Sequence, residues 1–146
     1  MPTGPSSSMP SAVLVGEGSL LTACGDLLLQ HGHDVRGVVS RALAVRTWAH
    51  ERGLATGETI ADLRALLDAE PVDHLFSIAN LRMLPADLFA RCRLAVNFHD
   101  AVLPRDAGVH ASAWAVLGRA RHHGITWHVM TAEADAGDIL VQRTFP

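Results

Sequence analysis

Residues 11–39 read SAVLVGEGSLLTACGDLLLQHGHDVRGVV, and this stretch decides the expected fold. The apolar run from Ser11 to Val15 predicts a buried strand, and the apolar spacing from Ser19 to Gln30 predicts an amphipathic helix. A second β-rich run follows from Asp34 to Val39. A strand, a helix and a second strand of this combined length are typical of a βαβ unit, so we expect the two strands to lie parallel.

Strands and helices alternate along the rest of the chain. Thr59 and Asp62 are spaced like a helix cap and a first-turn acid, and Pro71 marks the end of the helix that they predict. The apolar patterns predict strands at 73–78, 94–98, 124–130 and 139–145, and helices at 42–52, 59–69, 85–91 and 111–119. We therefore expect an α/β fold with one open, mostly parallel, Rossmann-like sheet and helices on both faces.

The composition suits one folded domain. The chain has 146 residues, of which 49% are hydrophobic and 18% charged. We expect residues 11–146 to form the domain and residues 1–10 to form a flexible leader.

The net charge of −3 argues against a nucleic-acid partner, and no apolar run approaches the ~18 residues that span a membrane. Cys24 and Cys92 are far apart and outside any metal-binding motif, which favours a cytoplasmic location and no metal.

Ligands of open α/β sheets bind at the carboxyl ends of the strands. In this chain the relevant strand ends lie near Val15, Ile78, Val96 and Met130, so the segments that follow these four residues are the candidates for ligand binding. The turn Gly16-Glu-Gly18 follows the first strand but lacks the third glycine of a dinucleotide-binding loop. A tight strand-to-helix turn is the favoured interpretation, and a bound NAD is the alternative.

Two polar residues, Asn97 and His99, stand where one predicted strand leaves the sheet. Alternation along an extended chain places both side chains on the same side. An amide is a fixed hydrogen-bond donor and an imidazole is a donor or proton carrier, so the pair can act on one reacting atom. The acidic loop from Glu133 to Asp138 can bring a carboxylate over His99 and orient it for proton transfer. Satisfied polar side chains and a solvated turn are the alternatives.

Other common catalytic arrangements fit the sequence less well. No GxSxG nucleophile elbow occurs, and both cysteines fall in predicted apolar surroundings. The pairs His122-His123 and His31-x-His33 lack the spacing of a metal site, so we interpret them as surface histidines.

Four motifs occur in the order and spacing of one enzyme family. They are Asn97-x-His99, Leu103-Pro104-x-x-x-Gly108, Gly124-Ile-Thr-x-His128 and Asp135-Ala-Gly-Asp-Ile-Leu140. The set resembles the catalytic domain of the folate-dependent formyltransferases over residues 12–145. The resemblance implies that Asn97, His99 and Asp135 are catalytic and that 10-formyltetrahydrofolate is the formyl donor.

The same resemblance implies further site residues. The pterin of the donor would be held by backbone groups of two segments, Arg82, Met83 and Leu84 in one, and Thr131, Ala132, Glu133 and Ala134 in the other. His128 would play a supporting role. Asp106 departs from the family pattern, in which many members have an aromatic residue two positions before the loop glycine, and this difference would alter the entry of the acceptor.

One subgroup is most similar to this chain, namely the formylation domains that begin nonribosomal peptide synthetases. The similarity lies in Val15-Gly-Glu-Gly-Ser-Leu-Leu21, Asn97-Phe-His-Asp100 and His123-Gly-Ile-Thr-Trp-His128, among other segments. It implies an acceptor α-amine on an aminoacyl group of a peptidyl carrier protein, beside an adenylation domain. An amino-sugar nucleotide acceptor and a catalytically silent docking domain are the alternatives. Because family domains continue past the last predicted strand, the resemblance also implies a domain truncated at its C-terminal end, with a homodimer contact through that edge.

Overall fold

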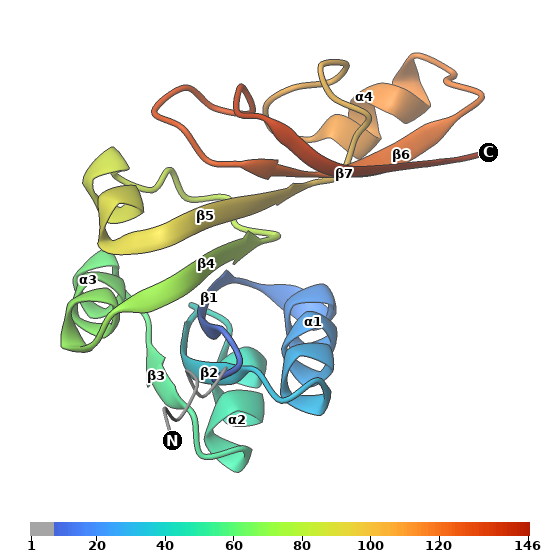
Figure 1. The fold of residues 1–146 in the computed structure, drawn as a ribbon. Helices are drawn as coiled ribbons and strands as arrows, with labels where there is room; N and C mark the ends of the chain where they lie inside the picture. The colour runs from blue at the N-terminus through green and yellow to red at the C-terminus, as the bar shows by residue number, and fades with distance from the viewer. Residues whose placement is uncertain (1–7) are drawn as a thin grey trace, which may run out of the picture.

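A computed structural model describes residues 8–146, which form a seven-stranded sheet with helices packed against it (Figure 1). The strands are β1 (Ser11–Gly16), β2 (Asp34–Val39), β3 (Ala55–Gly57), β4 (Val72–Ile78), β5 (Cys92–His99), β6 (His123–Val129) and β7 (Ile139–Phe145). The helices are α1 (Gly18–Gln30), α2 (Leu43–Glu51), α3 (Ile60–Ala69) and α4 (Ala111–Leu117), with a 3-10 helix η1 (Ala86–Arg91). Residues 1–7 of the expected leader lie outside the described residues.

The strand order in the sheet is β3-β2-β1-β4-β5-β6-β7. The first five of these strands are parallel to one another. β6 and β7 run antiparallel to their neighbours at one edge. The prediction of an open, mostly parallel α/β sheet is therefore confirmed.

Among the helices and strands of residues 8–146, the short strand β3 is the one that the sequence patterns do not predict. Ala55 and Thr56 are exposed, so β3 carries no apolar run that periodicity detects. It forms because its backbone pairs with Gly37, Val38 and Val39 of β2 at the sheet edge.

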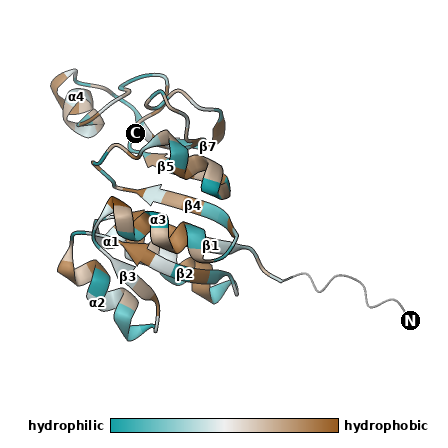
Figure 2. Cartoon of the chain, turned by 90° about the vertical axis from the view of Figure 1, so that its left-hand side faces the viewer, coloured by the Kyte–Doolittle hydropathy of each residue, from teal (hydrophilic) through white to brown (hydrophobic). Residues whose placement is uncertain are grey.

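The core is built around β1, in which every residue from Ala12 to Val15 is fully buried. Alternation along β1 sends Leu14 towards α1 and α2, where it packs with Leu21, Val45 and Trp48. Val13 and Val15 face the opposite layer and pack with Leu63, Leu67 and Leu88 of α3 and η1. Figure 2 shows apolar residues concentrated in β1 between these helices. Because each buried Val or Leu stabilises the fold by about 1.5–3 kcal/mol, this layered core holds the parallel strands in place.

The start of α3 follows the predicted cap. Thr59 Oγ1 accepts a hydrogen bond from the Asp62 backbone N–H at 3.1 Å. The Asp62 carboxylate accepts in return from the backbone N–H groups of Glu58 at 2.8 Å and Thr59 at 3.0 Å. These hydrogen bonds stabilise the charged form and lower the pKa of Asp62. The capping box that the sequence predicts is confirmed.

The Gly16-Glu-Gly18 turn has a packing reason for its first glycine. Gly16 has φ +140°, and a Cβ there would lie 1.7 Å from the Ile78 carbonyl oxygen. That oxygen accepts a hydrogen bond from the Glu17 backbone N–H at 3.2 Å. The close crossing of β1 and β4 therefore requires glycine, as a tight strand-to-helix turn predicts.

The antiparallel edge is less covered than the parallel part of the sheet. α4 lies above β6 and β7 in Figure 1, and the apolar residues of β7 remain exposed, namely Ile139, Leu140, Val141 and Phe145. Among residues 8–146, no helix has both the length and the apolar character needed to cross a membrane.

Candidate active site

Three neighbouring strands place polar side chains on one face of the sheet. In the sheet register, Ser77 of β4 is paired with Asn97 of β5, and Asn97 is paired with His128 of β6. His99 of β5 is paired with Thr126 of β6. Because partners in register project to the same face, these side chains line one polar region beside an apolar core. The prediction that Asn97 and His99 share a side is confirmed.

The loop that carries Asp135 reaches this region by folding back. We expected the segment after Met130 to lie with the carboxyl ends of the parallel strands, but β6 is antiparallel and ends level with the middle of β5. The Met130 N–H donates to the Ala95 carbonyl at 2.9 Å, and the Val129 N–H donates to the Asp138 carbonyl at 2.8 Å. This tight return places Asp135, with φ +54°, against the side chains of β5 and β6.

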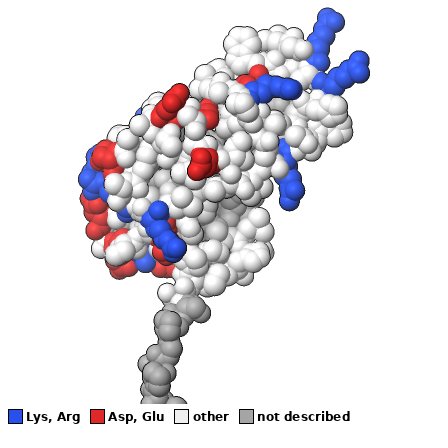
Figure 3. All heavy atoms as spheres, turned by 45° about the horizontal axis from the view of Figure 1, so that its top comes forward, with Lys and Arg blue, Asp and Glu red and all other residues white. Residues whose placement is uncertain are grey.

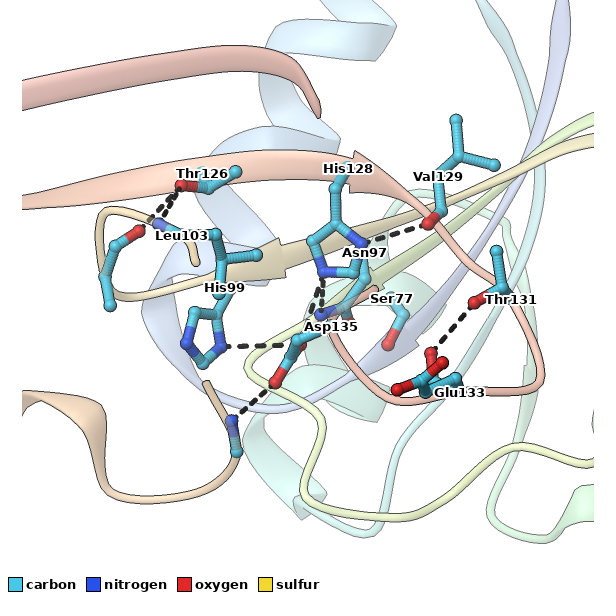
Figure 4. A network of polar contacts seen from close by, with 12 residues as sticks. Ser77, Asn97, His99, Leu103, Thr126, His128, Val129, Thr131, Glu133 and Asp135 are labelled. Carbon is cyan, nitrogen blue, oxygen red and sulfur yellow. Dashed lines mark hydrogen bonds and ion pairs between the residues drawn. The ribbon is translucent and has the colours of Figure 1, made fainter. Parts of the chain in front are cut away.

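Asp135 is the centre of the resulting polar cluster (Figure 4). Its Oδ1 lies 3.3 Å from His128 Nε2 and 3.6 Å from His99 Nδ1. Its Oδ2 accepts a hydrogen bond from the Gly108 backbone N–H at 2.7 Å. The His99 and His128 residues are 6% and 2% exposed, and the Asp135 side chain is 11% exposed. One carboxylate is thus shared by two buried imidazoles, where the low dielectric strengthens their interaction.

The outer sides of both imidazoles are also occupied. His99 Nε2 donates to the Asp106 carbonyl at 2.8 Å, and His128 Nδ1 donates to the Val129 carbonyl at 3.0 Å. Asn97 Nδ2 lies 3.3 Å from His128 Nε2. Asp106 has φ +54°, so a left-handed backbone conformation directs its carbonyl at His99. The loop that precedes α4 therefore helps to orient His99.

A buried hydrogen-bond node holds this loop in place. Thr126 Oγ1 donates to the Ala101 carbonyl at 2.7 Å and accepts from the Leu103 N–H at 3.3 Å. Gln142 Nε2 donates to Thr126 Oγ1 at 2.9 Å and to the Leu103 carbonyl at 3.0 Å. The sequence reasoning missed both Thr126 and Gln142. Each is one polar residue among several in its strand, so the sequence does not single it out or identify its partners.

The polar cluster opens into a cleft of about 480 Å³. The lining includes the catalytic candidates Asn97, His99 and Asp135 and also His128. Six of the seven residues expected to hold the pterin line it as well, namely Arg82, Met83, Leu84, Thr131, Glu133 and Ala134. Ala132, the seventh, is exposed and is not part of the lining.

One expected binding group, the backbone of Arg82, already has a partner. Asn80 Oδ1 accepts from the Arg82 N–H at 3.2 Å, and Asn80 Nδ2 donates to the Arg82 carbonyl at 3.1 Å and to Ser77 Oγ at 3.3 Å. Sequence reasoning missed Asn80, which rigidifies one wall of the cleft. Within residues 8–146, no side chain forms a hydrogen bond with the backbone groups of Met83 and Leu84, so these groups on the same wall can bind a ligand.

The cysteines and the paired histidines that the sequence offers for catalysis or metal binding lie outside this polar cluster. Burial raises the pKa of the Cys24 and Cys92 thiols, which disfavours the nucleophilic thiolate. His31 and His122 are exposed, whereas His33 and His123 are half-buried, so the expectation of surface histidines is only partly right. Within residues 8–146, no three His, Cys, Asp or Glu side chains are placed together to hold a metal ion.

Comparison with known proteins gives consistent relatives. The family model described as formyl transferase matches residues 11–146. A methionyl-tRNA formyltransferase of Anaeromyxobacter dehalogenans is 37% identical over 113 residues, which cover 74% of this chain and 36% of that protein. The chain thus spans about a third of the length of the curated relatives it matches first.

Solved structures share the fold at lower identity. Glycinamide ribonucleotide transformylase 1 from Symbiobacterium toebii has a TM-score of 0.84 at 22% identity, covering 96% of this chain and 74% of that one. A sugar 3N-formyl transferase, crystallised with dTDP and 5-N-formyl-THF, has a TM-score of 0.78 at 19% identity, covering 94% of this chain and 52% of that one.

Proposed function

The chain belongs to the formyl transferase family, and on that premise we propose that it transfers a formyl group from 10-formyltetrahydrofolate to a primary amine. The observation that carries the proposal is the cluster of Asn97, His99 and Asp135 at the end of β5, open to the 480 Å³ cleft. The cluster offers hydrogen-bond donors for a developing oxyanion and a carboxylate for the accompanying proton, which are the groups that acyl transfer requires.

Asn97 and His99 act on the formyl oxygen. A neutral amine attacks the formyl carbon, a C–N bond forms, and negative charge develops on the oxygen. The Asn97 amide and a ring N–H of His99 donate hydrogen bonds to that charge. Because His99 Nε2 donates to the Asp106 carbonyl in the free protein, the oxyanion replaces this carbonyl as acceptor when the substrates bind.

Asp135 assists the removal of the proton from the new ammonium group. Its Oδ2 is anchored by the Gly108 N–H, and its Oδ1 faces both imidazoles. With an ordered water it removes the ammonium proton, and this proton goes to the leaving nitrogen of the folate as its bond to the formyl carbon breaks. Asp135 Oδ1, 3.6 Å from His99 Nδ1, also orients the His99 imidazole.

For the donor, we propose a position between the two wall segments of the cleft. We place its pterin between Met83 and Leu84 on one side and Thr131, Glu133 and Ala134 on the other. The Thr131 hydroxyl donates to the Glu133 carbonyl at 2.9 Å and so shapes this second segment. A similar structure crystallised with 5-N-formyl-THF supports a reduced folate as the class of ligand.

For the acceptor, we favour the α-amine of an aminoacyl group carried on a peptidyl carrier protein beside an adenylation domain. The support is the motif similarity described above and the charge distribution. On the face shown in Figure 3, acidic and basic side chains interleave at one end, and further basic side chains lie at the other, with a largely uncharged area between. This face of residues 8–146 therefore shows no continuous basic stripe of the kind that follows a phosphate backbone.

Two other acceptors have support from the relatives. The similar methionyl-tRNA formyltransferases act, by name, on an α-amine held by an ester rather than a thioester. The sugar 3N-formyl transferase points to an amino-sugar nucleotide. We would incubate the protein and donor with an aminoacyl carrier protein, methionyl-tRNA or an amino-sugar nucleotide, and detect the added formyl mass. Formylation of the carrier-bound amine alone supports the favoured acceptor, and formylation of another acceptor alone overturns it.

Two remaining alternatives concern activity and assembly. A catalytically silent docking domain would bind no reduced-folate analogue, so calorimetric heat on titration with such an analogue excludes it. A homodimer would form through the exposed β7 edge, and light scattering that gives the mass of one chain would exclude that contact. Cys24 and Cys92 are both free, which suits a reducing, cytoplasmic location.

A further inference from the structure

The helix α4 presents its large apolar side chains to solvent. Its buried residues are two alanines one turn apart, Ala111 and Ala115. Its outer face, which we define as Trp114, Val116 and Leu117, is 61%, 77% and 74% exposed at these residues. A helix on the surface of a globular protein normally buries its large apolar residues and exposes polar ones. The reversed arrangement in α4 is typical of a surface that binds another molecule.

Three exposed arginines flank the outer face of α4 along the chain. Arg105 lies in the loop before the helix, and Arg119 and Arg121 follow its last turn. None of the three forms an ion pair with another described residue. Within residues 8–146, the arginines that do form ion pairs all lie before β5, namely Arg36, Arg46, Arg52, Arg64 and Arg91. The sequence has no Asp or Glu between Asp106 and Glu133, so α4 and the turn after it carry only positive charge of their own.

The start of α4 is part of the cleft described above. Val109 and His110 directly precede the helix and line the cleft. In the first turn of α4, Ser112 Oγ donates to the carboxylate of Asp100 at 2.6 Å, and Asp100 lines the cleft as well. Figure 1 shows α4 on the β6–β7 side of the sheet, away from β2 and β3. A macromolecule bound to the outer face of α4 would therefore lie next to the mouth of the cleft.

We propose that the outer face of α4, with the flanking Arg105, Arg119 and Arg121, docks an acidic surface of the carrier protein that delivers the acceptor amine. This inference rests on the proposed transfer to a carrier-bound amine and adds the surface that recognises the carrier. The apolar side chains form the centre of the contact, and the arginines complement acidic side chains of the partner. Tryptophan and arginine are also the residue types that most often dominate the binding energy of protein interfaces.

The make-up of this surface favours an acidic protein over the other macromolecules that could cover it. A nucleic acid is bound chiefly through its phosphates, and exposed Trp, Val and Leu side chains gain little from a hydrated phosphate backbone. In a two-fold contact between copies of this chain, the same surface meets itself, which brings arginines against arginines. An acidic protein partner uses both the apolar side chains and the positive charge.

A binding test compares the outer face with a matched surface. The probe is an acidic peptidyl carrier domain, titrated into the protein by calorimetry. We expect Trp114→Ser combined with Leu117→Ser to raise Kd by about tenfold or more, as truncation of central interface residues does. Leu43→Ser is the control, because Leu43 of α2 is 70% exposed and lies outside the cleft lining, and its Kd should equal that of the wild type. A wild type that does not bind the carrier, or a double variant that binds it equally well, overturns the proposal.

Charge reversal tests the contribution of the arginines. Arg119→Glu combined with Arg121→Glu should raise Kd, and added salt should weaken binding by the wild type more than by this variant. A carrier whose acidic surface residues are changed to lysine should regain affinity for the variant and lose it for the wild type. Arg41→Glu is the control, because Arg41 is exposed and follows β2, far from α4 in the strand order. Equal Kd values for the charge-reversed protein and the wild type contradict the proposal.

Kinetics separate docking from chemistry. We would compare an aminoacyl carrier domain with the same aminoacyl group on N-acetylcysteamine, a small thioester that has no protein surface to dock. The Trp114→Ser and Leu117→Ser double variant should lower kcat/KM for the carrier by about tenfold or more relative to the small thioester, mainly through KM. A purely structural role of α4 would lower both values alike, so an equal loss for both acceptors overturns the proposal. A wild type that formylates neither acceptor refutes the proposed function, and the calorimetric titration still decides the docking surface.

Two further measurements identify other occupants of this surface. The same double variant would be tested for binding of methionyl-tRNA and, by light scattering, for self-association. Both properties should be the same in the double variant and in the wild type. Loss of tRNA binding in the double variant would assign the surface to a nucleic acid, and conversion of a wild-type dimer to a monomer would assign it to a second copy of the chain. Either result overturns the carrier as its partner.

Discussion

Replacing Thr126 with valine tests whether the loop beside the active site is held by one buried hydroxyl. Valine keeps the shape of threonine and removes the oxygen. In the wild type that oxygen donates to the Ala101 carbonyl and accepts from the Leu103 N–H and Gln142 Nε2, at 2.7, 3.3 and 2.9 Å. Thr126 is fully buried, so water cannot replace the lost partners.

The magnitude follows from the three hydrogen bonds. At about 0.5–1.5 kcal/mol for each bond, we expect Thr126→Val to lower the free energy of unfolding by about 2–4 kcal/mol. The corresponding fall in Tm is roughly 5–15 °C for a domain of this size. We also expect a lower kcat, because the loop that Thr126 anchors carries the Asp106 carbonyl that orients His99.

Urea unfolding and calorimetry measure this loss, with two matched controls. Thr22→Val removes a hydroxyl whose single hydrogen bond, to the Ser19 carbonyl at 3.0 Å, is exposed, and should change stability by less than about 0.5 kcal/mol. Thr126→Ser keeps the hydroxyl and should recover most of the loss. If Thr126→Val were no less stable than Thr22→Val, the hydroxyl would not anchor the loop.

Three further predictions test other parts of the molecule. Asn97→Ala and His99→Ala should each lower the rate of formyl transfer by about 10²–10³ while circular dichroism stays native, and near-wild-type turnover in either would remove that residue from the proposed mechanism. Hydrogen bonds lower the pKa of Asp62 in the folded state, so its contribution to stability is present above the unfolded pKa and lost as pH falls through the folded one. Asp62→Asn should therefore destabilise the protein in urea at neutral pH, with the difference from wild type shrinking below about pH 4, and a pH-independent difference would contradict this. Gly16→Ala should destabilise the fold by about 3 kcal/mol or more, because its Cβ meets the Ile78 carbonyl at 1.7 Å and the backbone is strained, and a melting temperature equal to wild type would disprove the close crossing.

The parts that sequence reasoning predicted well depend on neighbours along the chain. The capping box at Thr59 and Asp62 spans one helical turn, and the shared side of Asn97 and His99 follows from strand alternation. Six of the seven residues that the family resemblance implies for the donor line the cleft, and it is the fold that brings their two loops together there. The sequence patterns did not predict β3, because a strand of three residues is too short to show a hydrophobic periodicity.

The amino-acid sequence by itself determined the order of the helices and of every strand except β3, the helix cap, and the shared side of Asn97 and His99, since each is encoded within a few residues. Only the tertiary structure decided that β6 runs antiparallel, that its loop returns Asp135 between His99 and His128, and that Thr126 and Gln142 anchor the opposite loop. The physical reason is that these contacts join residues far apart in the chain, and their strength depends on burial and hydrogen-bond direction. A carboxylate shared by two imidazoles exists only once the loops have closed around it.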